Sequence, residues 1–316
     1  LSNMGAIIET DPIKGNKRLV SDYLELIKKG ETALIVSPTH KQGENLTEAI
    51  REELKKAGKL GKQEITVRKL VNLNYTDAEK SDWRNIKQGQ QIQFTQNSDR
   101  IKRGSLWTVT KAANEKVDLL NEKGETRQLP LSQSDRYDIL EMEQIKLAKG
   151  DTVRITRGVF DQNKKRMDSG QLFNVVGLKD GKLTLRNKQS KTTYEVDKNF
   201  GHIAHAYCIT SHAAQGKTVD HVLISQPSAT FGATSLKQFY VSVSRGRYSA
   251  RIYTDDAKEL LKHASQIGDR KAAMELMHKD ANALDYVIND QRKRQQFYPS
   301  AKSTISEKNL NKRYFE

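Results

Sequence analysis

The chain contains 316 residues, of which 36% are hydrophobic and 29% charged, and its mean hydropathy is -0.75. No apolar run approaches the roughly 18 residues that a membrane-spanning helix needs, so we expect a soluble protein, and its length predicts more than one domain. The 54 Lys and Arg residues outnumber the 39 Asp and Glu residues, and the formal charge of +15 favours a polyanionic partner such as nucleic acid. A basic but otherwise ordinary enzyme would have the same balance.

The cysteine content and the amino end indicate the compartment and the completeness of the chain. Cys208 cannot form an internal disulfide, so a reducing cytoplasm is the simplest compartment. Its apolar surroundings favour a small buried side chain over a nucleophile. The amino end lacks the order of a secretory signal, and because Leu1 is not a natural start we expect a piece of a longer protein.

Residues 1–85 alternate helix and strand patterns. Apolar residues at helical spacing end at Gly30, the strand-like run "TALIVSPT" occupies residues 32–39, and a second helix is predicted over residues 44–57. Such alternation is typical of a parallel sheet covered by helices. We therefore predict that residues 1–85 form the first part of an α/β domain.

Residues 86–200 contain an internal repeat of β-type sequence. Three blocks recur in the same order, first within residues 89–121 and again within residues 150–187: "GQQIQFT" and "GDTVRIT", "GSLWTV" and "GQLFNV", "VDLLN" and "LTLRN". We predict two small antiparallel β-barrels, at residues 86–136 and 137–200.

Period-two alternation within the matched blocks predicts which side chains face each barrel interior. These inward residues are Ile92, Phe94, Val153 and Ile155. Equivalent aromatic residues, Trp107 and Phe173, fit the same cores, and base stacking is the alternative use for them.

The strand-helix texture returns in residues 201–265, so the barrels are expected to interrupt one α/β domain. Residues 266–316 are predicted to form a helical extension with a loose polar end.

The Gly-Lys-Thr at residues 216–218 matches only the end of a phosphate-binding loop. Such a loop needs a glycine five residues before Gly216, where this chain has Ser211, and a helix after the lysine, where it has the strand-like "TVDHVLIS". We therefore expect no complete nucleotide site in the chain.

Three stretches resemble parts of known helicases. "AYCITSHAAQGKTVDHVLI" (206–224) resembles motif V of superfamily 1 helicases of the RecD-like branch, and "QFYVSVSRGR" (238–247) resembles motif VI. "TALIVSPTHKQGENLTEAIREELKKAGKLG" (32–61) resembles a strand-turn-helix in the helicase part of TraI/TrwC-type conjugative relaxases. The resemblance extends over about residues 32–256.

The resemblance implies the second of two RecA-like motor domains, interrupted by two SH3-like barrels, a 2B-like copy and a 2B copy. The phosphate loop and the magnesium carboxylate would lie on the first RecA-like domain, so ATP and Mg²⁺ would bind only in the full-length parent and this piece alone would be inactive. Implied partners are single-stranded DNA, the first RecA-like domain and a type IV secretion coupling protein that reads the barrels as a translocation signal. The implied compartment is the bacterial cytoplasm, with export of the parent into a recipient cell.

The resemblance also assigns roles within motifs V and VI. Arg245 matches the arginine finger, which stabilises charge on the transferred phosphoryl group; a surface arginine at a helix carboxyl end is the alternative. The residues that match positions near the nucleotide are Gln215, Gly216, Lys217 and Arg247, and simple solvation is an alternative for Lys217 and Arg247.

Two pairs of residues are candidates for contact with the DNA backbone. Thr210 and His212 match motif V positions where a hydroxyl and a ring N–H can donate to phosphate oxygens. Thr39 and His40 follow the carboxyl end of a predicted strand, where open α/β sheets bind ligands. An ordinary turn with a helix cap is the alternative for this second pair.

Basic loops occupy equivalent positions in the two predicted barrels. They contain Arg157, Lys164, Lys165 and Arg166 in the second copy, and Lys102 and Arg103 in the first. We expect them to contact single-stranded DNA, although loop charges are often only solvated. No metal site is predicted at the chain's clustered histidines, His202, His205 and His212.

Two functions remain open from the sequence. The chain is either half of an ATP-driven 5'-to-3' DNA helicase motor or a vestigial helicase fold that only binds single-stranded DNA or presents a secretion signal. An RNA-directed protein is a third possibility, because no recognisable element reads the 2'-hydroxyl.

Overall fold

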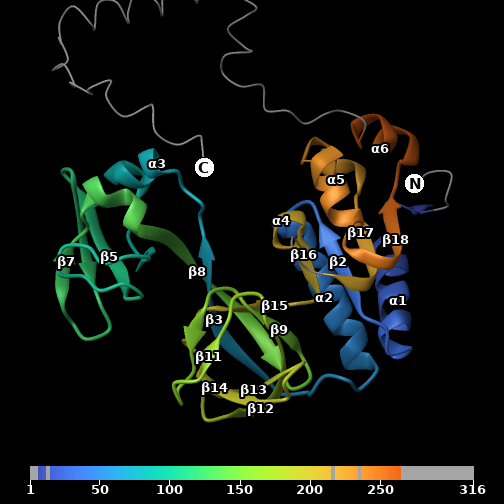
Figure 1. The fold of residues 1–316 in the computed structure, drawn as a ribbon, viewed down its shortest axis with the longest axis horizontal. Coiled ribbons are helices and arrows are strands. Elements are labelled where there is room, and N and C mark those ends of the chain that lie inside the picture. Colours follow the sequence, from blue (N-terminus) through green and yellow to red (C-terminus); the bar gives the residue numbers. More distant parts are fainter. Residues whose placement is uncertain (1–5, 12–14, 215–217, 234–235, 265–316) are drawn as a thin grey trace, which may run out of the picture. The chain divides into compact units, whose positions relative to one another are not determined.

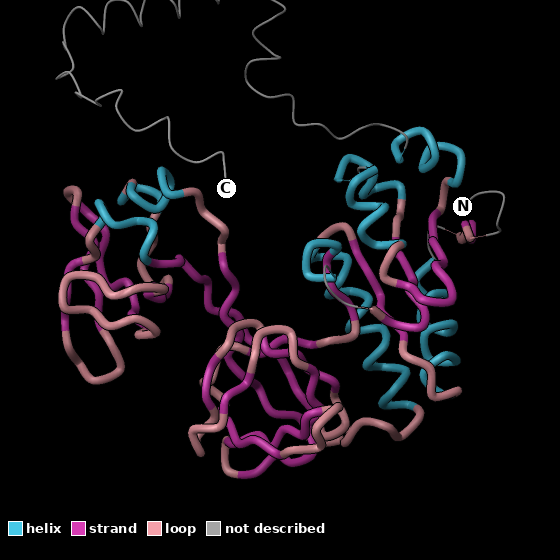
Figure 2. The backbone as a smooth tube through the Cα atoms, viewed as in Figure 1, coloured by secondary structure: helices cyan, strands magenta, loops and turns pink. Residues whose placement is uncertain are grey.

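The computed structural model describes residues 6–11, 15–214, 218–233 and 236–264 (Figures 1 and 2). All described residues belong to one compact unit within residues 1–266.

A parallel five-stranded sheet draws its strands from both ends of this unit. The strand order is β1-β18-β17-β2-β16, and every neighbouring pair runs parallel. The strands are β1 (Ile7–Glu9), β2 (Ala33–Ser37), β16 (Cys208–Thr210), β17 (Val219–Ser225) and β18 (Gly246–Thr254).

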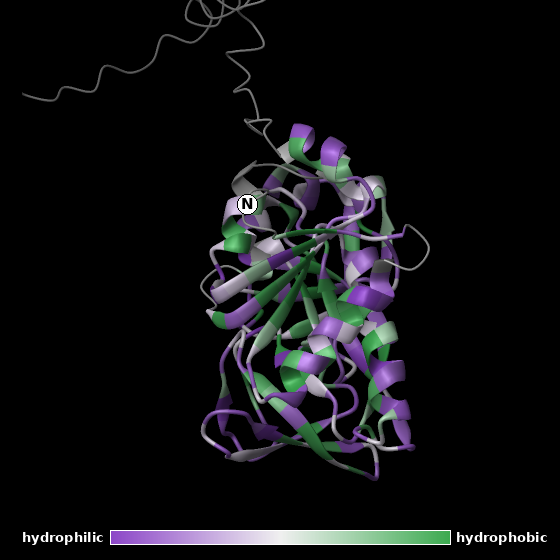
Figure 3. Ribbon diagram, turned by 90° about the vertical axis from the view of Figure 1, so that its right-hand side faces the viewer, coloured by the Kyte–Doolittle hydropathy of each residue, from purple (hydrophilic) through white to green (hydrophobic). Residues whose placement is uncertain are grey.

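Helices pack on both faces of the parallel sheet. Ile35 of β2 packs in one core cluster with Leu19 and Leu46, whereas the next residue, Val36, packs in another with Phe239. The hydrophobic residues accordingly concentrate along the strands (Figure 3). This arrangement confirms the predicted α/β class. The helices are α1 (Gly15–Lys28), α2 (His40–Lys56), α4 (Ser211–Ala214), α5 (Leu236–Val243) and α6 (Ala257–Ala264), with a 3-10 turn, η4 (Ser228–Ala233), before α5.

Helix α2 begins four residues earlier than the hydrophobic pattern predicted. The Thr39 hydroxyl accepts a hydrogen bond from the backbone N–H of Gln42 and so caps the first turn at His40. The first turn of α2 contains polar residues and Gly43, which gave no apolar signal, so the sequence pattern missed it.

The first antiparallel sheet has six strands in the order β3-β8-β4-β5-β6-β7. Helix α3 (Asp77–Ser81) and the 3-10 turns η2 (Trp83–Asn85) and η3 (Leu131–Arg136) connect its strands. The strands are β3 (Glu64–Asn72), β4 (Gln91–Phe94), β5 (Leu106–Ala113), β6 (Lys116–Leu120), β7 (Thr126–Gln128) and β8 (Tyr137–Ala148).

The second antiparallel sheet has five strands in the order β14-β13-β12-β9-β15, and a separate two-stranded hairpin joins β9 to β12. The sheet contains β9 (Thr152–Ile155), β12 (Leu172–Lys179), β13 (Lys182–Asn187), β14 (Thr193–Asp197) and β15 (Ile203–His205). The hairpin contains β10 (Val159–Phe160) and β11 (Arg166–Met167).

The two antiparallel sheets reproduce the internal repeat in their strand pairing. Ile92 lies opposite Trp107 in the first sheet, and Val153 lies opposite Phe173 in the second. The next paired strands break register two residues beyond these aromatics in both sheets. All predicted inward residues are buried, and both aromatics belong to the cores, as expected: Ile92, Phe94, Val153, Ile155, Trp107 and Phe173.

Strand pairing crosses the predicted segment boundaries in three places. β3 lies within the segment assigned to the parallel-sheet domain but pairs antiparallel with β8. β8 begins at residue 137, the predicted start of the second copy, yet its first four residues pair with β4 of the first. The strand-like run over residues 203–210 divides between β15 in the second antiparallel sheet and β16 in the parallel sheet.

A buried ion pair joins the parallel-sheet part to the second antiparallel sheet. Arg51 of α2 donates from Nε and Nη2 to the carboxylate of Asp151 at 3.0 and 3.1 Å, and the Tyr207 hydroxyl donates to the same carboxylate at 2.8 Å. Arg51 and Asp151 are 1% and 0% exposed. Burial alone would lower the pKa of Arg51, but the hydrogen bond and charge of Asp151 outweigh it and raise that pKa.

Candidate nucleic-acid interface

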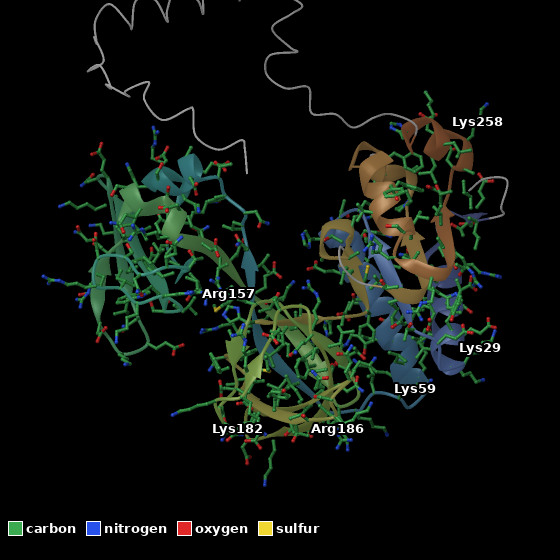
Figure 4. The ribbon with its side chains drawn as sticks, viewed as in Figure 1. Lys29, Lys59, Arg157, Lys182, Arg186 and Lys258 are labelled. Atoms are coloured by element: carbon green, nitrogen blue, oxygen red, sulfur yellow. The ribbon has the colours of Figure 1, made fainter. Side chains whose placement is uncertain are left out.

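A groove of about 1470 Å³ runs between the two antiparallel sheets, and we call it the inter-sheet groove. Arg157, labelled in Figure 4, lies at this junction, where its Nη1 donates to the Gln93 side chain at 2.9 Å and lies 3.2 Å from the Asp138 carboxylate. Seven cationic residues line the groove against the three carboxylates of Glu122, Glu125 and Asp197. The cationic residues are Arg100, Lys102, Arg103, Lys123, Arg127, Arg157 and Arg166.

Most of this positive charge is not neutralised by the protein. Arg157 pairs with Asp138 and Arg166 pairs with Asp168 at 2.8 Å. The lining cations that form no salt bridge with any described residue are Arg100, Lys102, Arg103, Lys123 and Arg127. The groove therefore has a surplus of solvated cations, which is the arrangement that attracts a polyanion.

The predicted basic residues divide into two groups. Lys102 and Arg103 of the first sheet and Arg157 and Arg166 of the second all line the inter-sheet groove, although they are far apart in sequence. Lys164 and Lys165 do not line it. The Lys165 ammonium donates to the Thr193 carbonyl at 3.2 Å and lies 5.9 Å from the centre of the Tyr194 ring.

Phe160 also lines the inter-sheet groove, although no sequence pattern predicted a role for it. It lies in β10 and is 62% exposed, whereas Trp107 and Phe173 are buried. An exposed ring beside solvated cations is suited to stacking against a base. The available signal was an aromatic residue inside a polar, turn-rich hairpin, "RGVFDQNKK".

His202 and His205, two of the clustered histidines, are engaged in separate contacts. His202 Nε2 lies 3.2 Å from the Gln93 amide, and His205 Nε2 lies 3.1 Å from the Lys146 carbonyl. Burial lowers the pKa of each to about 4, so both rings are neutral near pH 7. Within the described ranges, no three histidine, cysteine or acidic side chains are grouped as metal ligands would be.

A second cavity of about 870 Å³ lies at the carboxyl ends of β2 and β16, and we call it the strand-end cleft. The parallel register places Thr210 opposite Ser37, so Thr39 and His40 reach the same edge of the sheet as Thr210. All three predicted residues line the cleft. Thr39 also caps α2, so the helix-cap alternative holds for its hydroxyl. The side chain of His212 lies outside the described part of the structure.

Cys208 lines the strand-end cleft as a thiol and not as a thiolate. Burial raises its pKa to about 12, which leaves too little thiolate for nucleophilic reactions near pH 7. This agrees with the structural role expected from the sequence.

Arg245 lies just after α5, where its Nε donates to the Val241 carbonyl at 2.9 Å. This is the helix-end geometry that the sequence left open as an alternative to an arginine finger. The Arg245 carbonyl accepts from the N–H of Val219, two residues after Lys217. Arg247 is 60% exposed and lies 3.7 Å from the Asp220 carboxylate. The predicted nucleotide residues Gln215, Gly216 and Lys217 lie outside the described residues.

No helix formed by the described residues combines the length and hydrophobicity that crossing a bilayer requires.

No family model matches the chain, and no curated protein matches it. Among solved structures it is similar to Pif1 helicases. One is a structure of two coordinating Pif1 helicases at forked dsDNA, with 15% sequence identity, coverage of 86% of this chain and 52% of that chain, and a TM-score of 0.37. Another is Pif1 from Bacteroides in complex with ADP-AlF3 and ssDNA, with 16% identity, coverage of 87% of this chain and 56% of that chain, and a TM-score of 0.20. Pif1 from Candida albicans is also similar, with 13% identity, coverage of 89% of this chain and 58% of that chain, and a TM-score of 0.23. The chain thus spans little more than half of these helicases, and TM-scores this low carry no argument about its fold or activity.

Proposed function

We propose that this chain binds single-stranded DNA and that the inter-sheet groove is its main contact surface. The observation that carries the proposal is the surplus of cationic residues from both antiparallel sheets in one groove. Lys and Arg that neutralise phosphates release condensed counterions, and this release drives much of protein–DNA association. The predicted loops of both repeat copies contribute to the same surface.

The exposed aromatic ring favours a single strand over a duplex. Phe160 is 62% exposed on the groove wall, and a single strand offers unstacked bases to such a ring. In a duplex, both faces of an internal base are covered by its neighbours. Stacking on an aromatic side chain is tolerant of sequence, so we expect weak base preference.

We further propose that the chain is the second half of an ATP-dependent 5'-to-3' helicase motor of the RecD-like branch, within a TraI/TrwC-type relaxase-helicase. The parallel sheet would be the second RecA-like domain, drawn from residues 1–85 and 201–265, of which β3 and β15 instead pair into the antiparallel sheets. The antiparallel sheets would be SH3-like barrels of the 2B-like and 2B kind, at residues 86–136 and 137–200. Residues 266–316 would form an extension.

In this proposal the missing half of the motor supplies the phosphate loop and the magnesium ligand. ATP and Mg²⁺ would bind at a cleft whose second wall carries Arg245, with Gln215, Gly216, Lys217 and Arg247 near the nucleotide. The Val219–Arg245 backbone bond supports this grouping, because it brings Arg245 beside the strand that follows residues 215–217. The barrels would also act as a type IV secretion signal for a bacterial cytoplasmic parent that is exported to a recipient cell.

A DNA-binding module without ATPase activity is the second candidate. The contact between Arg245 Nε and the Val241 carbonyl favours it, because that hydrogen bond turns the guanidinium back onto its own helix. An arginine finger would need to exchange this contact for a phosphate of the nucleotide.

The groove is tested by changing Arg100, Lys102 and Arg103 together to Ala. If all three contact phosphates, the slope of log affinity against log salt for an oligonucleotide falls by about 2, at roughly 0.7 per contact. The measurement is fluorescence anisotropy over a salt series.

A matched control changes three exposed lysines that line neither cavity, Lys111, Lys116 and Lys182, also to Ala. We expect this control to retain the wild-type slope. Equal slopes for the groove variant and the wild type would reject the groove as the binding surface.

The motor is tested by Arg245→Ala in the full-length protein. An arginine finger contributes about 10³ to 10⁵ in rate, so ATP hydrolysis should be abolished while affinity for single-stranded DNA stays near normal. Steady-state ATPase assays and anisotropy measure the two effects. Retained turnover would leave the binding module as the better account.

A further inference from the structure

Arg154 is a partly buried cation without a partner among the described residues. Its Nε is the one buried side-chain nitrogen or oxygen in the described part of the chain that has no hydrogen bond. The guanidinium also forms no salt bridge with any described residue. It projects from β9 on the side opposite the core residues Val153 and Ile155 and lines the strand-end cleft.

The absence of a counter-charge has a physical cost. Burial lowers the pKa of Arg154, and no neighbouring carboxylate offsets this. An arginine nevertheless keeps its proton near neutral pH, so the positive charge persists in a partly desolvated position. Buried polar groups are nearly always paired, and an unpaired one in a folded protein requires an explanation.

The neighbours of Arg154 do not supply an anion. Its cross-strand partner on β15 is Ala204. Among the carboxylates that line the cleft, Glu143 lies 2.8 Å from the Lys69 ammonium and Glu44 lies 3.4 Å from the same ammonium. These acids are therefore already engaged by Lys69. Glu48 lies 3.6 Å from Arg51, whose main partner is Asp151.

The rest of the cleft offers hydrogen-bond donors suited to an oxyanion. The residues Thr39, Thr156 and Thr210 line it together with Arg154. A guanidinium presents two parallel N–H groups that match two phosphate oxygens, and threonine hydroxyls commonly contact phosphates as well. A volume of about 870 Å³ has room for a phosphate with its attached sugar.

We propose that Arg154 binds a phosphate group in the strand-end cleft, and that this phosphate belongs to the single strand held by the protein. The assignment of this phosphate to the single strand rests on the proposed function. The cleft then forms a phosphate subsite separate from the inter-sheet groove. The bound strand supplies the anion for Arg154, because no described residue of the protein does.

The main test is Arg154→Met, which keeps an unbranched apolar stem and removes the charge. Affinity for an oligonucleotide should fall roughly 10- to 100-fold, because one charge-assisted contact is lost. The slope of log affinity against log salt should fall by about 0.7. Arg154→Lys keeps the charge but loses the paired donors, so its affinity should lie between those of Met and wild type.

Thermal unfolding without DNA gives an independent readout. Removing an uncompensated charge should raise the midpoint of Arg154→Met by roughly 2 to 4 °C. The matched control is Arg186→Met, an exposed arginine on β13 of the same sheet (Figure 4), which should change neither the midpoint nor the affinity. A lowered midpoint with unchanged affinity would mean that Arg154 only packs, and would overturn the proposal.

Two further arms separate the possible failures. Inorganic phosphate should stabilise the wild type but not Arg154→Met; if it does so while the oligonucleotide slope is the same in both proteins, the strand assignment is wrong. If the Arg100, Lys102 and Arg103 variant loses oligonucleotide binding but Arg154→Met does not, the subsite fails while the proposed function stands. If the wild type binds no oligonucleotide, the proposed function itself fails.

Discussion

The two antiparallel sheets share a set of matched strands but use equivalent positions in them differently. Gly89 and Gly150 open the two copies, both with positive φ, at +89° and +99°. Gln91 bonds to Thr108 in the first copy, and Thr152 bonds to Asn174 at the equivalent pair in the second. The repeat therefore conserves the pairing of the matched strands, although the first sheet has the additional strand β3 and the second copy has the additional β10–β11 hairpin. Within the matched strands, the copies differ in particular side chains.

The position after the opening glycine shows how one copy acquired a docking contact. In the first copy the Gln90 side chain accepts from the Lys87 N–H at 2.8 Å and closes its own turn. In the second copy Asp151 accepts from the equivalent N–H, that of Ala148, at 2.7 Å. Asp151 also binds Arg51, so a residue that caps a turn in one sheet anchors the other sheet to the parallel-sheet part.

The fourth residue after the opening glycine also differs between the copies, but here the first copy has the hydrogen-bond partners and the second lacks them. Gln93 of the first copy is 4% exposed, and its side chain contacts both His202 and Arg157. Its equivalent in the second copy, Arg154, has no such partner. The cross-strand residue is Asp138 beside Gln93 but Ala204 beside Arg154. Side chains from outside the first copy thus satisfy Gln93, whereas the described residues leave Arg154 of the second copy for an external ligand.

Removing the docking carboxylate should have the largest effect. Asp151→Ala leaves the buried Arg51 guanidinium without its main partner and also removes an acceptor from Tyr207. We expect the free energy of unfolding to fall by about 3–5 kcal/mol. Denaturant-induced unfolding measures the change.

The equivalent change in the first copy is the control. Gln90→Ala loses one turn hydrogen bond and should cost about 1 kcal/mol. Adding Arg51→Met to Asp151→Ala should recover part of the loss, because it removes the uncompensated charge. Equal costs for Asp151→Ala and Gln90→Ala would contradict the anchoring role.

The sequence predicted the repeated framework well because that framework follows from local patterns. Alternation in "GQQIQFT" and "GDTVRIT" identified the inward side chains, and the order of the matched blocks identified the two copies. The parallel sheet was also predicted from helix and strand periodicity. These features depend on residues close together in the chain, so a single sequence records them.

The pairing of distant segments could not be predicted from such patterns. β3 and β15 each lie in stretches that alternate helix and strand patterns, yet both pair into antiparallel sheets. Their partners, β8 and β9, are distant in sequence, so no local pattern records the pairing. The shared groove of Lys102 and Arg157 is likewise a tertiary feature. In the sequence, Arg154 has the pattern of an ordinary outward strand residue, and only the structure shows that its Nε lacks a hydrogen-bond partner.

A smaller difference should distinguish the opening glycines. Gly89→Ala places a side chain at positive φ in open space, which should lower the free energy of unfolding by about 1–2 kcal/mol. Gly150→Ala has the same backbone strain, and its Cβ also overlaps the Lys59 carbonyl oxygen. We therefore expect this variant to lose roughly 1–3 kcal/mol more of the free energy of unfolding than Gly89→Ala. Denaturant unfolding of both variants measures the difference. If the two variants lose the same stability, the second copy is not pressed against the α2–β3 connection, and the asymmetry between the copies would then rest on Asp151 alone.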